Sequence, residues 1–241
     1  MTAAKRFWKS VSIDPVEDGF SICLDGRAVK TPAGAMLALP HQGLATAIAA
    51  EWDSQTEEIN PSTMPMFRFT VTAIDRVTPQ REAVIDEISL YGGSDLVCYR
   101  EAEDQALASR QHEAWQPYLD WFAKTEGVTL EVTSGIMPLR QSDEACRVMR
   151  DRVSRHDDFI LSGLHTLVTV SGSLLIGLAI AARHVAADEG ARAALLDDLW
   201  QQEKWGYDAE ADQRITAHTG LIGEASRYLG LLNTEEGGSE A

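Results

Sequence analysis

The sequence predicts an α+β protein with a small β-rich N-terminal domain, residues 1–60, followed by a larger all-helical C-terminal domain, residues 61–232. Within the first forty residues, apolar and polar side chains alternate, as they do in half-buried strands. From residue 41 onward, apolar side chains recur at three- and four-residue spacing, which places them on one face of a helix. The last residues, 233–241, are rich in Glu, Gly and Ser and predict a disordered tail.

The strongest local signal in the N-terminal domain is a β-hairpin at Asp25-Gly26. Residues 20–24 alternate in polarity before this dipeptide, and residues 27–30 can form the return strand. Asp-Gly between two apolar runs is typical of a two-residue hairpin turn.

One helix is expected in the N-terminal domain. Leu44, Ile48 and Trp52 are four residues apart and therefore lie on the same helical face. We expect Trp52 to be part of the core, with Glu51 and Asp53 facing outward.

The C-terminal domain is expected to be helical with two short β-like interruptions. Pro117 should kink or restart the helix around it, since it cannot donate a backbone hydrogen bond. The β-like runs and the later helices are expected at 96–99 and 128–132, and at 142–155, 158–185, 188–206 and 209–232.

Residues 159–182 contain no charged side chain. Their length allows a membrane-spanning segment, but their glycine, serine and threonine content favours a pair of buried core helices. The segment 170–173 could be a break between those two helices. A bilayer segment or membrane-facing hairpin is the alternative.

The chain is strongly acidic, with 37 Asp and Glu against 21 Lys and Arg and a formal net charge of -16. Nucleic-acid binding is disfavoured, because basic residues supply most of the affinity for phosphate backbones. The acidity either keeps the protein in solution or favours a basic partner surface. The three cysteines, Cys23, Cys98 and Cys146, are widely spaced and predict neither a disulfide framework nor a zinc site.

No motif for catalysis, metal binding or cofactor binding is found. Gly172 and Gly177 have the glycine spacing of a phosphate-binding loop, but Leu178-Ala179 follow where Lys and Ser or Thr are needed. We therefore expect no catalytic residue, no metal and no cofactor. An enzyme or small-ligand-binding protein with a site between the two domains remains an alternative, because catalytic groups converge in space and not in sequence.

The segment 195–207 is expected to present a mixed surface to a partner. On a helical wheel, Asp197 and Asp198 lie on the polar side, whereas Glu203 falls inside the apolar arc. Glu203 there needs an internal ion pair or a role in binding, because an unpaired buried carboxylate is costly. Trp205 lies among polar residues, where it either packs on a neighbouring helix or anchors a partner.

Several segments, in order along residues 6–232, resemble the assembly chaperones specific for the alpha subunit of the ATP synthase catalytic head, a mitochondrial and alphaproteobacterial family. The segments that carry the resemblance are Arg6-Phe7-Trp8-Lys9, Leu24-Asp25-Gly26-Arg27, Lys30-Thr31-Pro32, Glu51-Trp52-Asp53-Ser54-Gln55, residues 91–99 (YGGSDLVCY), Leu161-Ser162-Gly163-Leu164 and Glu203-Lys204-Trp205-Gly206.

The resemblance implies an ATP-independent molecular chaperone that binds the unassembled alpha subunit and promotes its assembly with the beta subunit. It also implies a functional acidic position shortly before the Trp-Gly pair. We place that position at Asp197, with Asp198 and Glu203 as alternatives, and take these three residues and Trp205 as the candidate partner-binding residues. We expect a monomer in the bacterial cytoplasm, with no stable membrane insertion. A membrane-associated factor that uses 159–182 is a further alternative.

Overall fold

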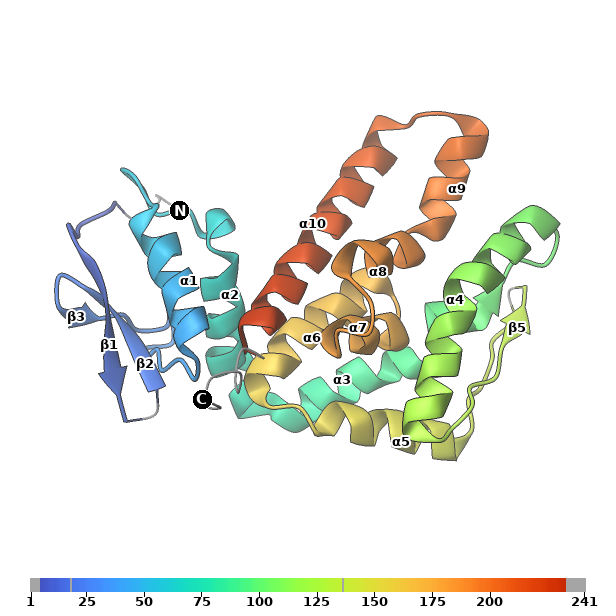
Figure 1. The fold of residues 1–241 in the computed structure, drawn as a ribbon, viewed down its shortest axis with the longest axis horizontal. Helices are drawn as coiled ribbons and strands as arrows, with labels where there is room; N and C mark the ends of the chain where they lie inside the picture. Colours follow the sequence, from blue (N-terminus) through green and yellow to red (C-terminus); the bar gives the residue numbers. More distant parts are fainter. Residues whose placement is uncertain (1–4, 18, 136, 233–241) are drawn as a thin grey trace, which may run out of the picture. The chain divides into compact units, whose positions relative to one another are not determined.

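The computed structural model describes residues 5–17, 19–135 and 137–232, and these residues form a small N-terminal sheet followed by a mostly helical chain (Figure 1). This confirms the predicted fold class. The predicted disordered tail, 233–241, lies outside the described residues. The antiparallel sheet has the order β1-β2-β3, and its strands are β1 (Val11–Val16), β2 (Gly19–Leu24) and β3 (Arg27–Ala28).

The predicted hairpin at Asp25-Gly26 joins β2 to β3. Both residues have positive φ angles, 49° and 76°, as in the two-residue turns that match strand twist. The Asp25 carboxylate also accepts hydrogen bonds from the backbone amides of Lys9 and Ser10 at 2.9–3.2 Å. These bonds lower the pKa of Asp25 and tie the chain before β1 to the turn.

Helix α1 (Gln42–Asp53) packs on β1 and β2 through the predicted apolar face. Leu44 and Ile48 are fully buried and Trp52 is 7% exposed, as expected. The expectation for Glu51 was wrong. Its carboxylate accepts hydrogen bonds at 2.8 Å from two amides in the first turn of the next helix, α2 (Pro65–Thr72), and so satisfies donors that have no partner within that helix.

The remaining elements are helices and short strands. Short turns precede and follow α2. They are the 3-10 turn η1 (Pro61–Thr63), the π-turn η2 (Ala73–Val77) and the 3-10 turn η3 (Thr78–Gln80). A further 3-10 turn is η4 (Leu96–Cys98). The longer helices are α3 (Arg81–Gly93), α4 (Gln105–Glu126), α5 (Asp143–Ser154), α6 (Asp158–Ser171), α7 (Leu174–Ala181), α8 (Ala187–Ala194), α9 (Leu196–Trp205) and α10 (Ala209–Leu232).

Two helices expected to be continuous are each divided in two. The segment 158–185 breaks at Gly172, whose φ of 68° is outside the helical region, so the alternative of two short helices was right. The segment 188–206 breaks at Leu195, between α8 and α9. Among the described residues, no helix is long and apolar enough to cross a membrane.

Two local expectations between residues 99 and 135 need correction. Pro117 lies inside the single helix α4, so the expected restart does not occur, and a kink at this residue stays a prediction. Residues 128–132 form no strand; the strand is instead β5 (Thr133–Ser134), which pairs in parallel with β4 (Tyr99–Arg100).

The chain divides into two compact units. The first contains the sheet, α1 and α2, with residues 158–163 and 227–232, and the second contains residues 82–157 and 164–226. The expected domain boundary between residues 60 and 61 stays a prediction.

A buried carboxylate, that of Asp95, organises the second unit. Asp95 is fully buried and accepts hydrogen bonds from the backbone amide of Val97 at 3.1 Å and from that of Leu175 at 3.0 Å. It is therefore the N-cap of η4 and also binds an amide in the first turn of α7, although the two elements are about eighty residues apart in sequence. Burial raises its pKa to about 6, although these hydrogen bonds oppose the shift.

We predict that Trp52→Ala strongly destabilises the protein. The Trp52 ring packs edge-on against Trp8 and Phe67, with ring centroids 5.2 and 5.1 Å away. Truncation of a buried Trp leaves a cavity and typically costs about 3–5 kcal/mol. Chemical denaturation should show this loss, with Thr56→Ala at a nearby exposed position as the control. A Trp52→Ala protein as stable as the parent would remove Trp52 from the core.

We predict that Asp95 makes stability depend on pH between about 4 and 6. In this window the folded protein holds a proton on Asp95 that the unfolded chain has released, so the contribution of Asp95 to the free energy of unfolding falls as pH rises. The free energy of unfolding of the parent minus that of Asp95→Asn should fall by up to about 1.4 kcal/mol for each unit by which the pH rises. Urea denaturation at several pH values measures that difference, and a constant difference would contradict the assignment.

Candidate partner-binding surface

Helix α9 begins among buried residues and ends at the protein surface. Leu196 and Trp200 are buried, whereas residues 203–210 are all exposed. Gly206 ends the helix with a φ of 93° and a ψ of 177°, a conformation open to glycine and strained for other residues. Figure 1 shows the resulting connection at the outer end of α9 and α10. We call residues 203–210 the α9–α10 tip.

Asp197 is half-buried, so the expectation that it lies on an exposed polar side was wrong. Its carboxylate accepts a hydrogen bond at 2.8 Å from the side-chain amide of Gln111, which is 3% exposed. The amide oxygen of Gln111 in turn accepts the backbone amide of Glu101 at 2.6 Å. Burial raises the pKa of Asp197, and the charges of Asp198 and Glu101 act in the same direction. Asp197 therefore holds α9 to α4.

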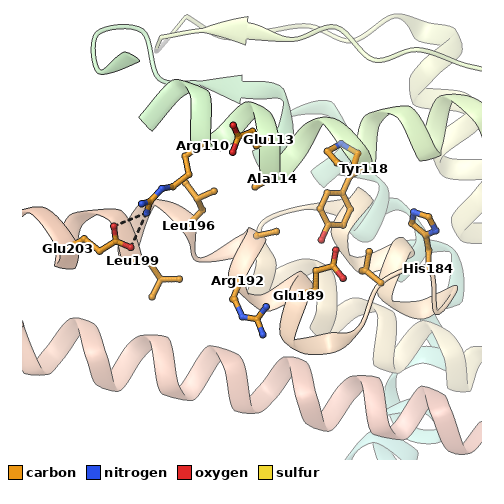
Figure 2. Close-up of a pocket in the computed structure, with 13 residues that line it drawn as sticks. Arg110, Glu113, Ala114, Tyr118, His184, Glu189, Arg192, Leu196, Leu199 and Glu203 are labelled. Atoms are coloured by element: carbon orange, nitrogen blue, oxygen red, sulfur yellow. Dashed lines mark hydrogen bonds and ion pairs between the residues drawn. The ribbon is translucent and has the colours of Figure 1, made fainter. Parts of the chain in front are cut away.

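Asp198 and Glu203 are both ion-paired near the surface. Asp198 pairs with Arg214 of α10 at 2.6 Å, and its side chain is 31% exposed. Glu203 accepts two hydrogen bonds from Arg110 of α4 at 2.8 and 2.9 Å, and its side chain is 55% exposed (Figure 2). The expected internal ion pair exists, but the expected burial of Glu203 was wrong.

The indole ring of Trp200 explains where Arg110 lies. The guanidinium of Arg110 and the ammonium of Lys204 are each 4.6 Å from the centre of this ring. Both distances fit cation–π attraction. Arg110 is thus held by an aromatic face and by a carboxylate, and it links α4 to the last turn of α9.

Trp205 and Tyr207 are the most exposed aromatic residues of this surface, at 80% and 75%. Packing of Trp205 within its own bundle, one of the two expectations, is therefore excluded. Tyr207 follows Gly206, at which α9 has already ended. Large exposed apolar side chains of this kind often mark a binding site.

The four predicted residues lie along one helix but do not converge. Asp197 and Glu203 bind α4, Asp198 binds α10, and Trp205 faces solvent. Sequence reasoning missed Gln111, Arg110 and Arg214, the three partners that define their environments. Within the described ranges, no three His, Cys, Asp or Glu residues are placed to hold a metal ion. Of the four residues, Trp205 is thus the one whose side chain is available for contact with a partner.

We predict that Asp197→Ala destabilises the protein more than Glu203→Ala, the reverse of the order that the helical wheel suggests. Loss of the Asp197 carboxylate leaves the buried amide of Gln111 without its acceptor, at a cost of about 1–3 kcal/mol. Loss of Glu203 breaks an exposed ion pair, worth about 0–1 kcal/mol. Urea denaturation of both variants measures the two costs, and an equal or inverted order would contradict this assignment.

Comparison with known proteins places the chain among chaperones. The sequence model of the ATP12 chaperone protein family matches residues 5–123. The crystal structure of Atp12 from Paracoccus denitrificans superposes with a TM-score of 0.92 at 37% identity, covering 95% of this chain and 98% of that one.

Two yeast proteins are more distant relatives. Mitochondrial protein atp12 of Schizosaccharomyces pombe is 24% identical over 87% of this chain and 76% of its own length. Mitochondrial protein ATP12 of Saccharomyces cerevisiae is 25% identical over 91% of this chain and 83% of its own length. The match to the Paracoccus structure spans nearly both chains with the same fold, and on that basis this chain belongs to the ATP12 family of ATP synthase assembly chaperones.

Proposed function

We propose that this protein binds the unassembled alpha subunit of the ATP synthase and, without using ATP, keeps it competent to join the beta subunit. The alpha subunit is called the client below. The observation that carries the proposal is the α9–α10 tip, where Trp205 and Tyr207 stand almost fully exposed. Tryptophan and tyrosine are the residue types that most often anchor protein interfaces.

The charge of the chain supports a client surface that is basic around its apolar part. The formal net charge is -16, and the tip carries the exposed acidic residues Asp208 and Glu210 beside its aromatic residues. Such a field speeds encounter with a basic surface and orients it, while the aromatic residues supply most of the contact energy.

A chaperone of this kind has to release its client to the true partner. Surfaces that wait for a partner subunit are apolar and aggregate when left uncovered. A modest interface with a few aromatic anchors and a polar rim covers such a surface and still allows exchange. The small number of exposed aromatic residues at the tip supports an interface of this size.

We infer that the protein acts by binding and not by catalysis, and that it does so as a monomer in a bacterial cytoplasm, without nucleic acid. Its membership of a chaperone family supports the first point. The incomplete phosphate-loop motif at Gly172–Gly177 supports independence from ATP, since Gly172 is the break between two core helices.

We predict that the protein suppresses aggregation of refolding alpha subunit at stoichiometric concentration, with no added nucleotide. Light scattering of the diluted, denatured client measures the effect, and ATP plus magnesium should not change it. An unrelated protein of equal net charge is the control. Scattering that is unchanged by the chaperone would refute the proposed function.

We predict that Trp205→Ala raises the dissociation constant for the client by about 30-fold, as measured in a binding titration. This factor corresponds to the loss of a hot-spot residue that contributes about 2 kcal/mol. The variant's free energy of unfolding should stay within about 0.5 kcal/mol of the parent, because the side chain is 80% exposed. Leu90→Ala, at a position 74% exposed outside the tip, is the matched control and should bind normally. Equal binding by Trp205→Ala and the parent would remove the tip from the interface.

A further inference from the structure

The second compact unit contains a pocket of about 380 Å³ between α4, α8 and α9 (Figure 2). This volume lies at the lower end of the range for small-ligand sites. Its walls are largely apolar and are formed by Ala114, Pro117, Val185, Ala193, Leu196 and Leu199. Walls of this kind suit the methylene groups of a long side chain.

The hydroxyl group of Tyr118 lies at this pocket without a partner. Tyr118 is 3% exposed, and its hydroxyl oxygen makes no hydrogen bond with any of the described residues. Figure 2 shows the hydroxyl directed toward the carboxylate of Glu189. A buried polar group left unpaired costs free energy, so an occupant that donates a hydrogen bond to this oxygen recovers that cost.

Tyr118 keeps its proton at neutral pH. Burial, and then the negative charge of Glu189, raises the pKa of Tyr118 to about 12. The hydroxyl therefore presents acceptor lone pairs toward an incoming donor and its own hydrogen toward an acceptor such as the neighbouring carboxylate.

The uncompensated charge of the pocket is negative. Glu113 and Glu189 line it, and neither forms an ion pair with the residues that the structure describes. Both side chains belong to exposed residues.

The two arginines of the pocket are already engaged. Arg110 is bound by both carboxylate oxygens of Glu203, and Arg192 pairs with Asp188 one turn earlier on α8. Their positive charges are therefore largely cancelled, and a cation that enters the pocket encounters the free carboxylates.

We propose that this pocket seats one lysine or arginine side chain of the client, with its methylene stem along the apolar wall and its charged head between Tyr118 and Glu189. The inference rests on the proposed function and extends it. The pocket shares Leu196, Leu199 and Glu203 with α9, the helix that ends in Trp205. One basic segment of the client can therefore contact both the pocket and the aromatic tip.

The test measures client binding for two pocket variants of the full chain. Glu189→Gln should weaken binding at least about tenfold at low salt and should reduce the salt dependence of the dissociation constant, because one attractive charge is lost. Tyr118→Phe should weaken binding severalfold while the melting temperature stays equal or rises, since only an unpaired hydroxyl is removed. Glu131→Gln, at an exposed carboxylate outside the pocket, is the control and should bind like the parent.

A competition experiment identifies the chemistry that the pocket accepts. Nα-acetyl-lysine amide at millimolar concentration should displace the client in part, whereas Nα-acetyl-norleucine amide, which keeps the stem and lacks the ammonium group, should not. Equal competition by the two amides would overturn the cationic assignment.

The outcomes separate the two proposals. A parent protein that does not bind the alpha subunit refutes the proposed function. A parent that binds, together with Glu189→Gln and Tyr118→Phe variants that bind equally well, refutes the pocket inference alone. Loss of binding in both variants, with Glu131→Gln unaffected, supports it.

Discussion

The second compact unit depends on the hydrogen bonds that satisfy one buried carboxylate. Asp95 accepts the amides of Val97 and Leu175, and without those donors a fully buried carboxylate would be costly. The bonds hold η4 against the start of α7, and α4 packs on both of these elements. Because α4 carries Arg110, Gln111 and Tyr118, the position of every α4 group that contacts α9 or the pocket follows from this junction. Helix α9 is thus packed against a helix that this junction positions.

The residues that carry the family resemblance are mostly structural, and several of them contact one another. Arg6 pairs with Asp53, and Trp8 packs on Trp52, so two separate motifs form one cluster in the first unit. Gly92 lies against Met149 and Leu174, where an added Cβ would approach Met149 Sδ to 2.3 Å. Asp95 belongs to the same motif as Gly92. Most of the segments that carry the resemblance therefore have packing and capping roles, whereas Glu203-Lys204-Trp205-Gly206 lies in the α9–α10 tip.

The sequence predicts those features whose causes are local, and it fails where distant residues decide. The turn at Asp25-Gly26 is encoded in two residues that adopt positive φ, and it was predicted correctly. Strand β5 was misplaced because it exists through parallel pairing with β4, which no local pattern reveals. The break at Leu195 was not predicted, because neither glycine nor proline occurs at that point in the sequence. At the candidate site, the helical wheel placed Trp205 on the polar side, and the residue is exposed, but its role in binding stays a prediction. The surroundings of Asp197 and Glu203 depend on Gln111 and Arg110, 86 and 93 residues away.

The six tryptophans differ in exposure, and all of them lie in described residues. Their intrinsic fluorescence can therefore report on one part of the protein. Trp8, Trp52, Trp115 and Trp200 are 7% exposed or less, Trp121 is half-buried, and Trp205 is 80% exposed. Indole emission moves to longer wavelength in water, and collisional quenchers reach only accessible rings. The long-wavelength edge of the emission and its quenching by acrylamide therefore come mainly from Trp205. Contact at the α9–α10 tip would shift that edge to shorter wavelength and shield it from acrylamide, so occupancy of the tip can be followed without any attached dye.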